Sequence, residues 1–219
     1  PITGPNTDEL VEKVFTISIS DPGNLPEFYG PDALSSLSKK IVKYIFGSNA
    51  KIQYGGDFRK EGFTQFMIEE LAIINSRLNH KGKPLTVYKL GLSANEEFRS
   101  FYSKYNALIK VEEIEELLID VDEQVNRKYQ LSLMRRKMVD HTDYMIVSGG
   151  KLSGFSGLLP GVLEEVLIGI FLDVPVYIYS SYGGVSEIIF DYFLGDSDSI
   201  SIIDNIFDIA LDSINEIGL

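Results

Sequence analysis

The sequence predicts an α/β fold, a Rossmann-like parallel sheet with helices on both faces. Short apolar runs of strand length alternate along the chain with longer stretches of helical periodicity. This alternation is typical of parallel strands joined by crossover helices. The strand-length runs are apolar on both faces, as expected for strands that helices cover on two sides. Hydrophobic residues make up 44% of the 219 residues, which is enough for one sizeable core.

Each element follows from a local pattern. Runs rich in β-branched and aromatic residues predict five strands, at residues 14–19, 51–54, 85–90, 144–148 and 176–179. Apolar residues that recur every three or four positions predict helices at residues 33–46, 63–78, 121–141, 162–172, 186–194 and 200–217. The less regular region 93–116 is expected to hold a short helix at 96–105 and an edge strand at 107–111.

The composition narrows the function classes. No linker divides the chain, so we expect a single domain over residues 1–219, and its polar first residues resemble the end of a linker from a larger protein. The longest apolar runs are too short to span a membrane. The absence of cysteine fits a cytoplasmic protein. A net charge of −12 repels nucleic-acid backbones, so no nucleic-acid partner is expected.

Metal and common catalytic motifs are missing from the sequence. The two histidines, His80 and His141, do not have the spacing of metal ligands, so no metal site is expected. Neither the glycine-rich loop of P-loop ATPases nor the Gly-x-Ser-x-Gly turn of serine hydrolases occurs.

Polar and glycine-rich loops follow three of the predicted strands, and the carboxyl ends of parallel strands lie along one edge of a sheet. The first loop contains Ser20. In the second, Gly55 and Gly56 are expected to turn the chain with positive φ. Asp57 could accept a hydrogen bond from a ribose hydroxyl, and the guanidinium of Arg59 could bind a phosphate. Thr64 could cap the helix that follows or contact the ligand. The alternative for this loop is a tight turn with an Asp–Arg surface pair.

The third loop begins with Gly149 and Gly150 and ends at Gly161, with Ser156 between them. Glycines followed by a new helix form a typical phosphate site, because backbone N–H groups and the helix N-terminus face the anion. Glu165, in the first turn of that helix, either complements the helix dipole or holds ribose hydroxyls.

One arginine of the preceding helix is expected to face inward. At 100° per residue, Arg136 falls on the stripe formed by Val121, Val125, Tyr129 and Leu133, whereas Arg135 lies toward its flank. A guanidinium on a core-facing stripe needs a partner. The partner of Arg136 is either Glu165 or a ligand phosphate, and the sequence leaves both open.

These residues resemble the SLOG superfamily, the Rossmann-like group that contains the LOG cytokinin-activating enzymes. Met134-Arg135-Arg136-Lys137 is similar to the Met-His-x-Arg-Lys helix end of LOG enzymes, without the histidine. Gly149-Gly150 and Val162-Leu163-Glu164-Glu165 are similar to the two ends of Pro-Gly-Gly-x-Gly-Thr-x-x-Glu, with residues 151–161 inserted and Val162 in place of threonine. The arginine and glutamate with which LOG enzymes cleave the N-glycosidic bond would map to Arg136 and Glu165.

Over nearly its full length the chain resembles the SLOG domains that stand beside TIR or Sir2 NADase domains in bacterial defence proteins of the Thoeris type. The segments that carry this resemblance are an Ile-Ser-Asp-Pro sequence and residues 54–64 and 154–165. It implies a sensor without a cofactor that binds an ADP-ribose-like or cyclic ADP-ribose nucleotide. It also implies self-association and control of an attached or partner effector.

Three functions therefore remain after the sequence analysis. The first is the nucleotide sensor, with ligand contacts from Ser20, Gly55, Gly56, Asp57, Arg59, Thr64, Arg136, Gly149, Gly150, Ser156, Gly161 and Glu165. The second is a LOG-like phosphoribohydrolase that uses Arg136 and Glu165 on nucleoside monophosphates. The third is an interaction domain whose pocket no longer binds a ligand.

Overall fold

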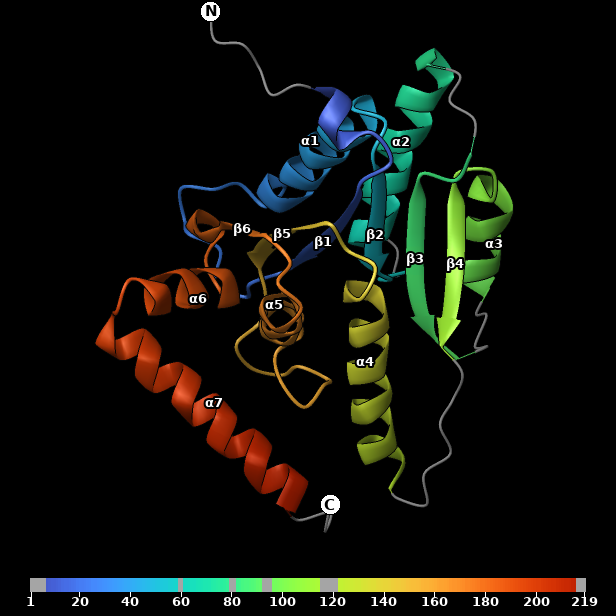
Figure 1. Ribbon diagram of the computed structural model, residues 1–219. Helices are drawn as coiled ribbons and strands as arrows, with labels where there is room; N and C mark the ends of the chain where they lie inside the picture. The colour runs from blue at the N-terminus through green and yellow to red at the C-terminus, as the bar shows by residue number, and fades with distance from the viewer. Residues whose placement is uncertain (1–6, 59–60, 79–81, 92–95, 115–121, 216–219) are drawn as a thin grey trace, which may run out of the picture.

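The computed structural model describes residues 7–58, 61–78, 82–91, 96–114 and 122–215. Its centre is a parallel six-stranded sheet with the order β4-β3-β2-β1-β5-β6 (Figure 1). The strands are β1 (Val14–Ser20), β2 (Lys51–Gly55), β3 (Leu85–Leu90), β4 (Ile109–Ile114), β5 (Tyr144–Gly149) and β6 (Val176–Tyr179). The predicted α/β class, the five strands and the additional edge strand are confirmed.

Helices cover both faces of the sheet. They are α1 (Ala33–Gly47), α2 (Phe63–Leu78), α3 (Glu96–Tyr105), α4 (Glu123–Val139), α5 (Gly161–Phe171), α6 (Val185–Phe193) and α7 (Ser197–Asn215), with short 3-10 turns at Thr7–Leu10 and Ser180–Tyr182. The cluster of α1, α2 and α3 fills one face, and the cluster of α4, α5 and α6 fills the other. Each predicted helix is present, with ends shifted by a few residues.

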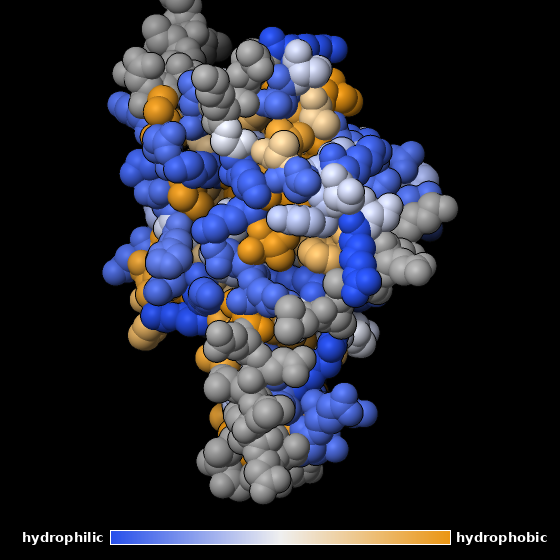
Figure 2. All heavy atoms as spheres, turned by 90° about the vertical axis from the view of Figure 1, so that its right-hand side faces the viewer, coloured by the Kyte–Doolittle hydropathy of each residue, from blue (hydrophilic) through white to orange (hydrophobic). Residues whose placement is uncertain are grey.

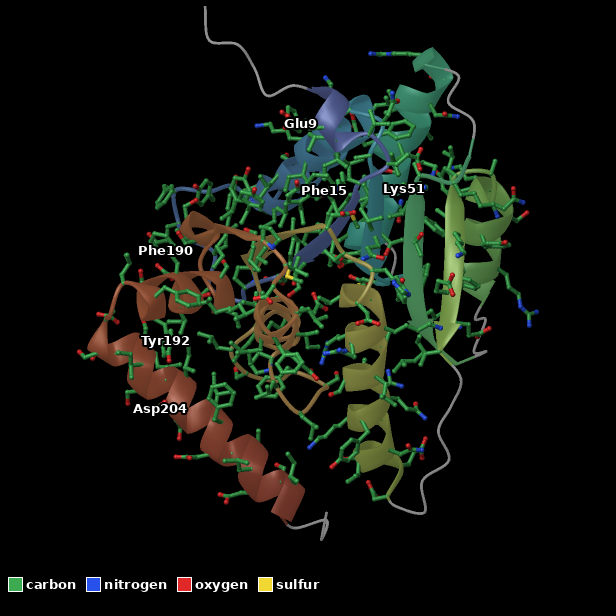
Figure 3. All side chains as sticks on the ribbon, in the orientation of Figure 1. Glu9, Phe15, Lys51, Phe190, Tyr192 and Asp204 are labelled. Atoms are coloured by element: carbon green, nitrogen blue, oxygen red, sulfur yellow. The ribbon has the colours of Figure 1, made fainter. Side chains whose placement is uncertain are left out.

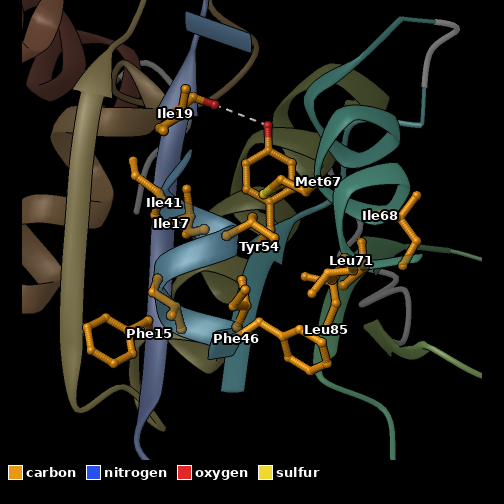
Figure 4. Close-up of a cluster of buried hydrophobic side chains, with 14 of the residues drawn as sticks. Phe15, Ile17, Ile19, Ile41, Phe46, Tyr54, Met67, Ile68, Leu71 and Leu85 are labelled. Atoms are coloured by element: carbon orange, nitrogen blue, oxygen red, sulfur yellow. Dashed lines mark hydrogen bonds between the residues drawn. The ribbon is translucent and has the colours of Figure 1, made fainter. Parts of the chain in front are cut away.

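Successive side chains of β1 point to opposite faces of the sheet and so contribute to different helix layers. Phe15, Ile17 and Ile19 point into the layer of α1 and α2, so Ser18 and Thr16 point toward α4 and α5. Figure 4 shows the first cluster, in which the Tyr54 hydroxyl donates to the carbonyl oxygen of Ile19 at 3.1 Å. This bond ties the carboxyl ends of β1 and β2 together.

A buried polar network fixes α4 on the other face. The Gln53 side-chain amide of β2 donates to the Thr16 hydroxyl at 2.8 Å and to the carbonyl oxygen of Met138 at 2.7 Å. The Tyr88 hydroxyl donates to the Gln53 side-chain oxygen at 3.3 Å. Because buried polar groups are costly unless they are paired, this network specifies where the last turns of α4 lie against β1 and β2.

The chain changes direction beside β1. From β1 it moves outward through β2, β3 and β4, and α4 then returns it to β5 on the other side of β1. Ser20 pairs with Gly149 at the carboxyl ends of β1 and β5. This is the topological switch point of the sheet, where open α/β proteins form ligand-binding crevices.

The periphery differs between the two ends of the sheet. At the β4 end, hydrophilic side chains cover most of the face, and hydrophobic ones gather near its middle (Figure 2). At the β6 end, α7 packs on α6, which carries Phe190 and Tyr192 (Figure 3). Within the described part of the chain, no helix is both long enough and apolar enough to cross a bilayer.

Candidate functional site

A cavity of about 330 Å³, here called the switch-point pocket, lies at the carboxyl ends of β1 and β2. Its walls come from the end of β1, the end of β2, α4, the loop after β5 and the first turns of α5. Its lining residues are Ser18, Ile19, Ser20, Asp21, Tyr54, Gly55, Arg135, Lys151, Gly154, Phe155, Ser156, Gly161, Val162 and Glu165. Segments distant in sequence therefore meet at one site, as expected from parallel strands.

A second cavity of about 570 Å³ adjoins it on the side of α1 and α2. The two share Asp21, and the second cavity is further lined by Pro22, Leu25, Pro31, Asp32, Leu34, Ser35, Asp57, Glu61, Gly62, Phe63 and Phe66. Both volumes fall within the range of about 300–1,000 Å³ typical of small-molecule sites. The switch-point pocket is the more polar of the two, and the second cavity, against α1 and α2, is the more apolar.

The polar end is organised around Arg135. Its side chain is 10% exposed, and its guanidinium forms a short ion pair with Glu164 of α5. The Arg135 Nε also lies 3.8 Å from a carboxylate oxygen of Glu165. One buried cation thus faces two buried carboxylates, so this cluster has a formal charge of −1.

Two glycines make room for the guanidinium. A Cβ added to Gly157 would lie 2.5 Å from one terminal nitrogen of Arg135, and a Cβ added to Gly161 would lie 2.8 Å from the other. Arg135 thereby fastens the loop after β5 to the beginning of α5.

Glu165 has an unusual environment for a carboxyl group. Burial raises its pKa above the ordinary value of 4.5, although Arg135 and the Ser18 hydroxyl both favour the ionised form. Ser18 itself is 2% exposed, and although its hydroxyl favours the ionised form of Glu165, it meets no described residue with the distance and angle of a hydrogen bond. Buried hydroxyl groups normally find a partner, so Ser18 is a polar group left open at the pocket.

Of the residues predicted to bind ligand, five line the switch-point pocket: Ser20, Gly55, Ser156, Gly161 and Glu165. Asp57 lines the second cavity instead. Arg59 lies outside the described residues. The loop after β6, at residues 180–184, packs closely against the loops after β1 and β5, so a Cβ on Gly184 would overlap Pro22 and the Gly150 carbonyl oxygen. It contributes no lining residue to either cavity.

The expected inward orientation of Arg136 is wrong. Arg136 lies on the outside of α4, where its side chain is 45% exposed, pairs with Asp140 at 3.5 Å and stacks over the Phe171 ring at 5.6 Å. Leu133, on the stripe used for the prediction, is 41% exposed. The buried arginine beside Glu165 is Arg135.

The expected backbone conformation of the second loop needs correction. Neither Gly55 nor Gly56 has a positive φ. Position 56 requires glycine for another reason, since a Cβ there would overlap the side chains of Phe58 and Val87. The Thr64 hydroxyl accepts from the N–H of Asp57, in the loop before its helix, at 3.0 Å.

The N–H groups of Gly149 and Gly150 are not open donors. The N–H of Gly149 donates to the Ser186 hydroxyl at 2.9 Å, and that of Gly150 donates to the Ser20 carbonyl oxygen at 2.9 Å. Both glycines have positive φ, at 67° and 97°. They hold the carboxyl ends of β1 and β5 and the start of α6 together beside the switch-point pocket.

Sequence reasoning missed Ser18, Arg135 and Lys151. Thr16, Ser18 and Ser20 form a row of hydroxyls on one face of an otherwise apolar buried strand, a signal available in the sequence. On α4, the arc set by Met134, Met138 and Val139 includes Arg135 and excludes Arg136. Lys151 had no sequence signal beyond its place after Gly150.

Among the described residues, no group of three or more His, Asp and Glu side chains could hold a metal. No curated protein matches the sequence. The sequence model of the family described as SLOG cluster2 matches residues 9–204, a span that contains every strand and both cavities. The chain therefore belongs to the SLOG superfamily.

Proposed function

We propose that the chain is a sensor domain that binds an ADP-ribose-like or cyclic ADP-ribose nucleotide at the switch point of its sheet. The observation that carries the proposal is the pair of adjoining cavities at the carboxyl ends of β1 and β2, which share Asp21. An ADP-ribose-like molecule has two nucleoside-like ends, and two neighbouring cavities could each receive one of them. Membership of the SLOG superfamily supports a nucleotide-related function.

The setting of this sensor belongs to the proposal as well. We place it in bacterial antiphage defence, in the cytoplasm, as one domain that controls a TIR or other effector in the same chain or in a partner. The resemblance to the sensors of Thoeris-type proteins supports this setting. Binding must favour one of two conformations or assemblies for the signal to pass on.

Self-association is the proposed route of that signal. Large apolar side chains are exposed along β6, α5, α6 and α7, among them Phe171 at 77%, Tyr177 at 54%, Phe193 at 60%, Leu194 at 71% and Leu211 at 56%. Exposed apolar patches of this kind often mark interaction surfaces. Sedimentation velocity with and without ADP-ribose would show whether the ligand changes the mass of the particle.

Thermal unfolding with ADP-ribose, cyclic ADP-ribose and AMP tests the binding itself. A ligand present at 100 times its Kd stabilises the fold by about 2.7 kcal/mol. We expect Lys151→Ala, which changes the pocket lining, to weaken binding, and Lys83→Ala to leave it unchanged, because exposed Lys83 lies just before the amino end of β3 and lines neither cavity. The absence of a thermal shift with all three nucleotides would contradict the proposal and favour an interaction domain.

A phosphoribohydrolase is the second candidate, and the contact between Arg135 and Glu165 favours it. A carboxylate beside a positively charged ribosyl centre stabilises the transition state of N-glycosidic cleavage, and Glu165 is the pocket carboxylate nearest to Arg135 Nε among the described residues. Incubation with AMP, followed by chromatography for free adenine, separates the two functions. Adenine release that Glu165→Gln abolishes and Glu27→Gln preserves would establish the hydrolase; no release would leave the sensor.

A further inference from the structure

We propose that the inner end of the switch-point pocket binds the two hydroxyls of a ribose, through Ser18 and Glu165, and that Lys151 holds the adjoining phosphate at the mouth. The inference rests on the proposed function and adds the orientation of the nucleotide and the part of it that is recognised. It predicts that the protein distinguishes ribose from 2′-deoxyribose.

Ser18 supplies the first argument. Its side chain is almost fully buried, it lines the pocket, and its hydroxyl has no hydrogen-bond partner among the described residues. A hydroxyl can donate one hydrogen bond and accept others, so a ligand hydroxyl would satisfy it in either direction. A ligand that lacks this hydroxyl would leave Ser18 as it is, buried and unpaired.

Glu165 supplies the acceptor for a second hydroxyl. Glu165 and Ser18 line the same pocket, one from the first turns of α5 and the other from β1. An ionised carboxylate has two acceptor oxygens and no donor, so it binds O–H groups and repels phosphate oxygens. Adjacent hydroxyls on a ribose match a carboxylate and a serine side by side.

The charges around Arg135 exclude a phosphate from the same place. The guanidinium already pairs with Glu164 and faces Glu165, so it has two carboxyl neighbours before any ligand enters. A phosphate would add further negative charge to a site of low dielectric, where repulsion is strong. Arg135 consequently positions the two glutamates and does not bind the phosphate.

Among the described residues that line the switch-point pocket, Lys151 is the only cationic residue besides Arg135. It is exposed, so it lies at the mouth, and it makes no ion pair with another described residue. A phosphate can reach Lys151 while the sugar enters the pocket. The nucleotide is thereby oriented with its ribose inward and its phosphate outward.

Calorimetric titration of the full chain tests the inference with three probes: ADP-ribose, its analogue without the 2′-hydroxyl on the adenosine ribose, and its analogue without the 2″-hydroxyl on the terminal ribose. We expect one analogue to bind at least about tenfold more weakly than ADP-ribose, since a site built for a hydroxyl rejects a ligand that lacks it. That analogue identifies the ribose held at Ser18.

Serine variants connect this discrimination to the pocket. Ser18→Ala should reduce the difference between ADP-ribose and the sensitive analogue to less than about threefold. Ser38→Ala is the matched control, because Ser38 is equally buried but donates to the Ser35 carbonyl oxygen in α1. It should leave the difference unchanged.

The outcomes separate the inference from the proposed function. If ADP-ribose and both analogues bind equally well, or if Ser18→Ala retains the full discrimination, the orientation is wrong while nucleotide binding stands. If none of the three probes binds, the proposed function fails and the orientation fails with it.

Discussion

Arg135 and Arg136 are neighbours in sequence but lie in opposite environments. The Arg135 side chain is 10% exposed against two carboxylates, whereas the Arg136 side chain is 45% exposed beside Asp140. Removing one partner of a buried ion pair typically costs about 3–5 kcal/mol, and an exposed pair contributes about 0–1 kcal/mol. The same substitution at the two positions should therefore have unequal effects.

We predict that Arg135→Met lowers the free energy of unfolding by about 3–5 kcal/mol, because it leaves Glu164 and Glu165 buried without their cation. Arg136→Met should cost less than about 1 kcal/mol. Urea denaturation measures both, provided that the two variants share one m-value. Equal losses in the two variants would show that Arg135 is not paired as described.

We predict that removing the charge of Glu165 stabilises the fold, by an amount that depends on pH. Its folded-state pKa is raised by burial, so the ionised carboxylate destabilises the fold at pH values above that raised pKa. Glu165→Gln should therefore raise the unfolding temperature at neutral pH. The gain should shrink as the pH falls below the raised pKa and vanish below 4.5, where the wild-type carboxyl is protonated in both the folded and the unfolded state.

The measurement is thermal unfolding of wild type and variant from about pH 4 to pH 8. Glu27→Gln is the control, since Glu27 is exposed and lines neither cavity. A loss of stability in Glu165→Gln at neutral pH would mean that the attraction to Arg135 outweighs burial, against the direction given for this pKa.

At the scale of elements, the turn after β5 depends on a glycine with little space around it. Gly149 and Gly154 both have φ of 67°. A Cβ on Gly149 would overlap the Ser20 carbonyl oxygen at the end of β1, whereas a Cβ on Gly154 would meet nothing within 4 Å. The two positions separate backbone strain from steric overlap.

We predict that Gly154→Ala costs about 1 kcal/mol, the strain of an L-residue in the left-handed region. Gly149→Ala should cost at least about 2 kcal/mol more, because the ends of β1 and β5 must move apart. Chemical denaturation gives the two values. Similar costs would show that the loop after β5 relaxes without disturbing the sheet.

The sequence predicted the elements better than the site, for a physical reason. Strands and helices follow from local periodicity, so the sheet, its edge strand and the helices were all found from apolar runs. The inward face of α4 depends on the last two turns, where Met134 and Met138 pack on the sheet. The prediction took its stripe of residues from the earlier, more exposed part of the helix. That choice moved the expected inward face by one residue and selected Arg136 in place of Arg135.

The use of backbone donors was equally hard to predict. Gly149 and Gly150 have the composition of an anion-binding loop, but their N–H groups are taken by Ser186 and by the Ser20 carbonyl oxygen. These partners come from α6 and β1, far away in sequence. Only the tertiary arrangement determines whether a glycine donates to a ligand or to the fold.

For the whole molecule, the net charge of −12 opposes the approach of an anionic nucleotide. Repulsion between like charges is screened within about 30 Å at 0.01 M salt and about 8 Å at 0.15 M salt. The proposed ligand should therefore associate faster when salt is added, the reverse of what is found for most charged ligands, which bind surfaces of opposite charge.

We predict that the association rate constant of ADP-ribose rises about 2- to 5-fold between 0.01 and 0.15 M NaCl, as the field of the acidic surface is screened. Stopped-flow measurement gives this rate, and adenosine, which carries no charge, is the control whose rate should not change. Lys151→Ala should increase the salt effect, because it removes the local attraction at the mouth of the switch-point pocket. An association rate that falls with salt would mean that Lys151 and the N-terminus of α5 attract the ligand more strongly than the rest of the molecule repels it.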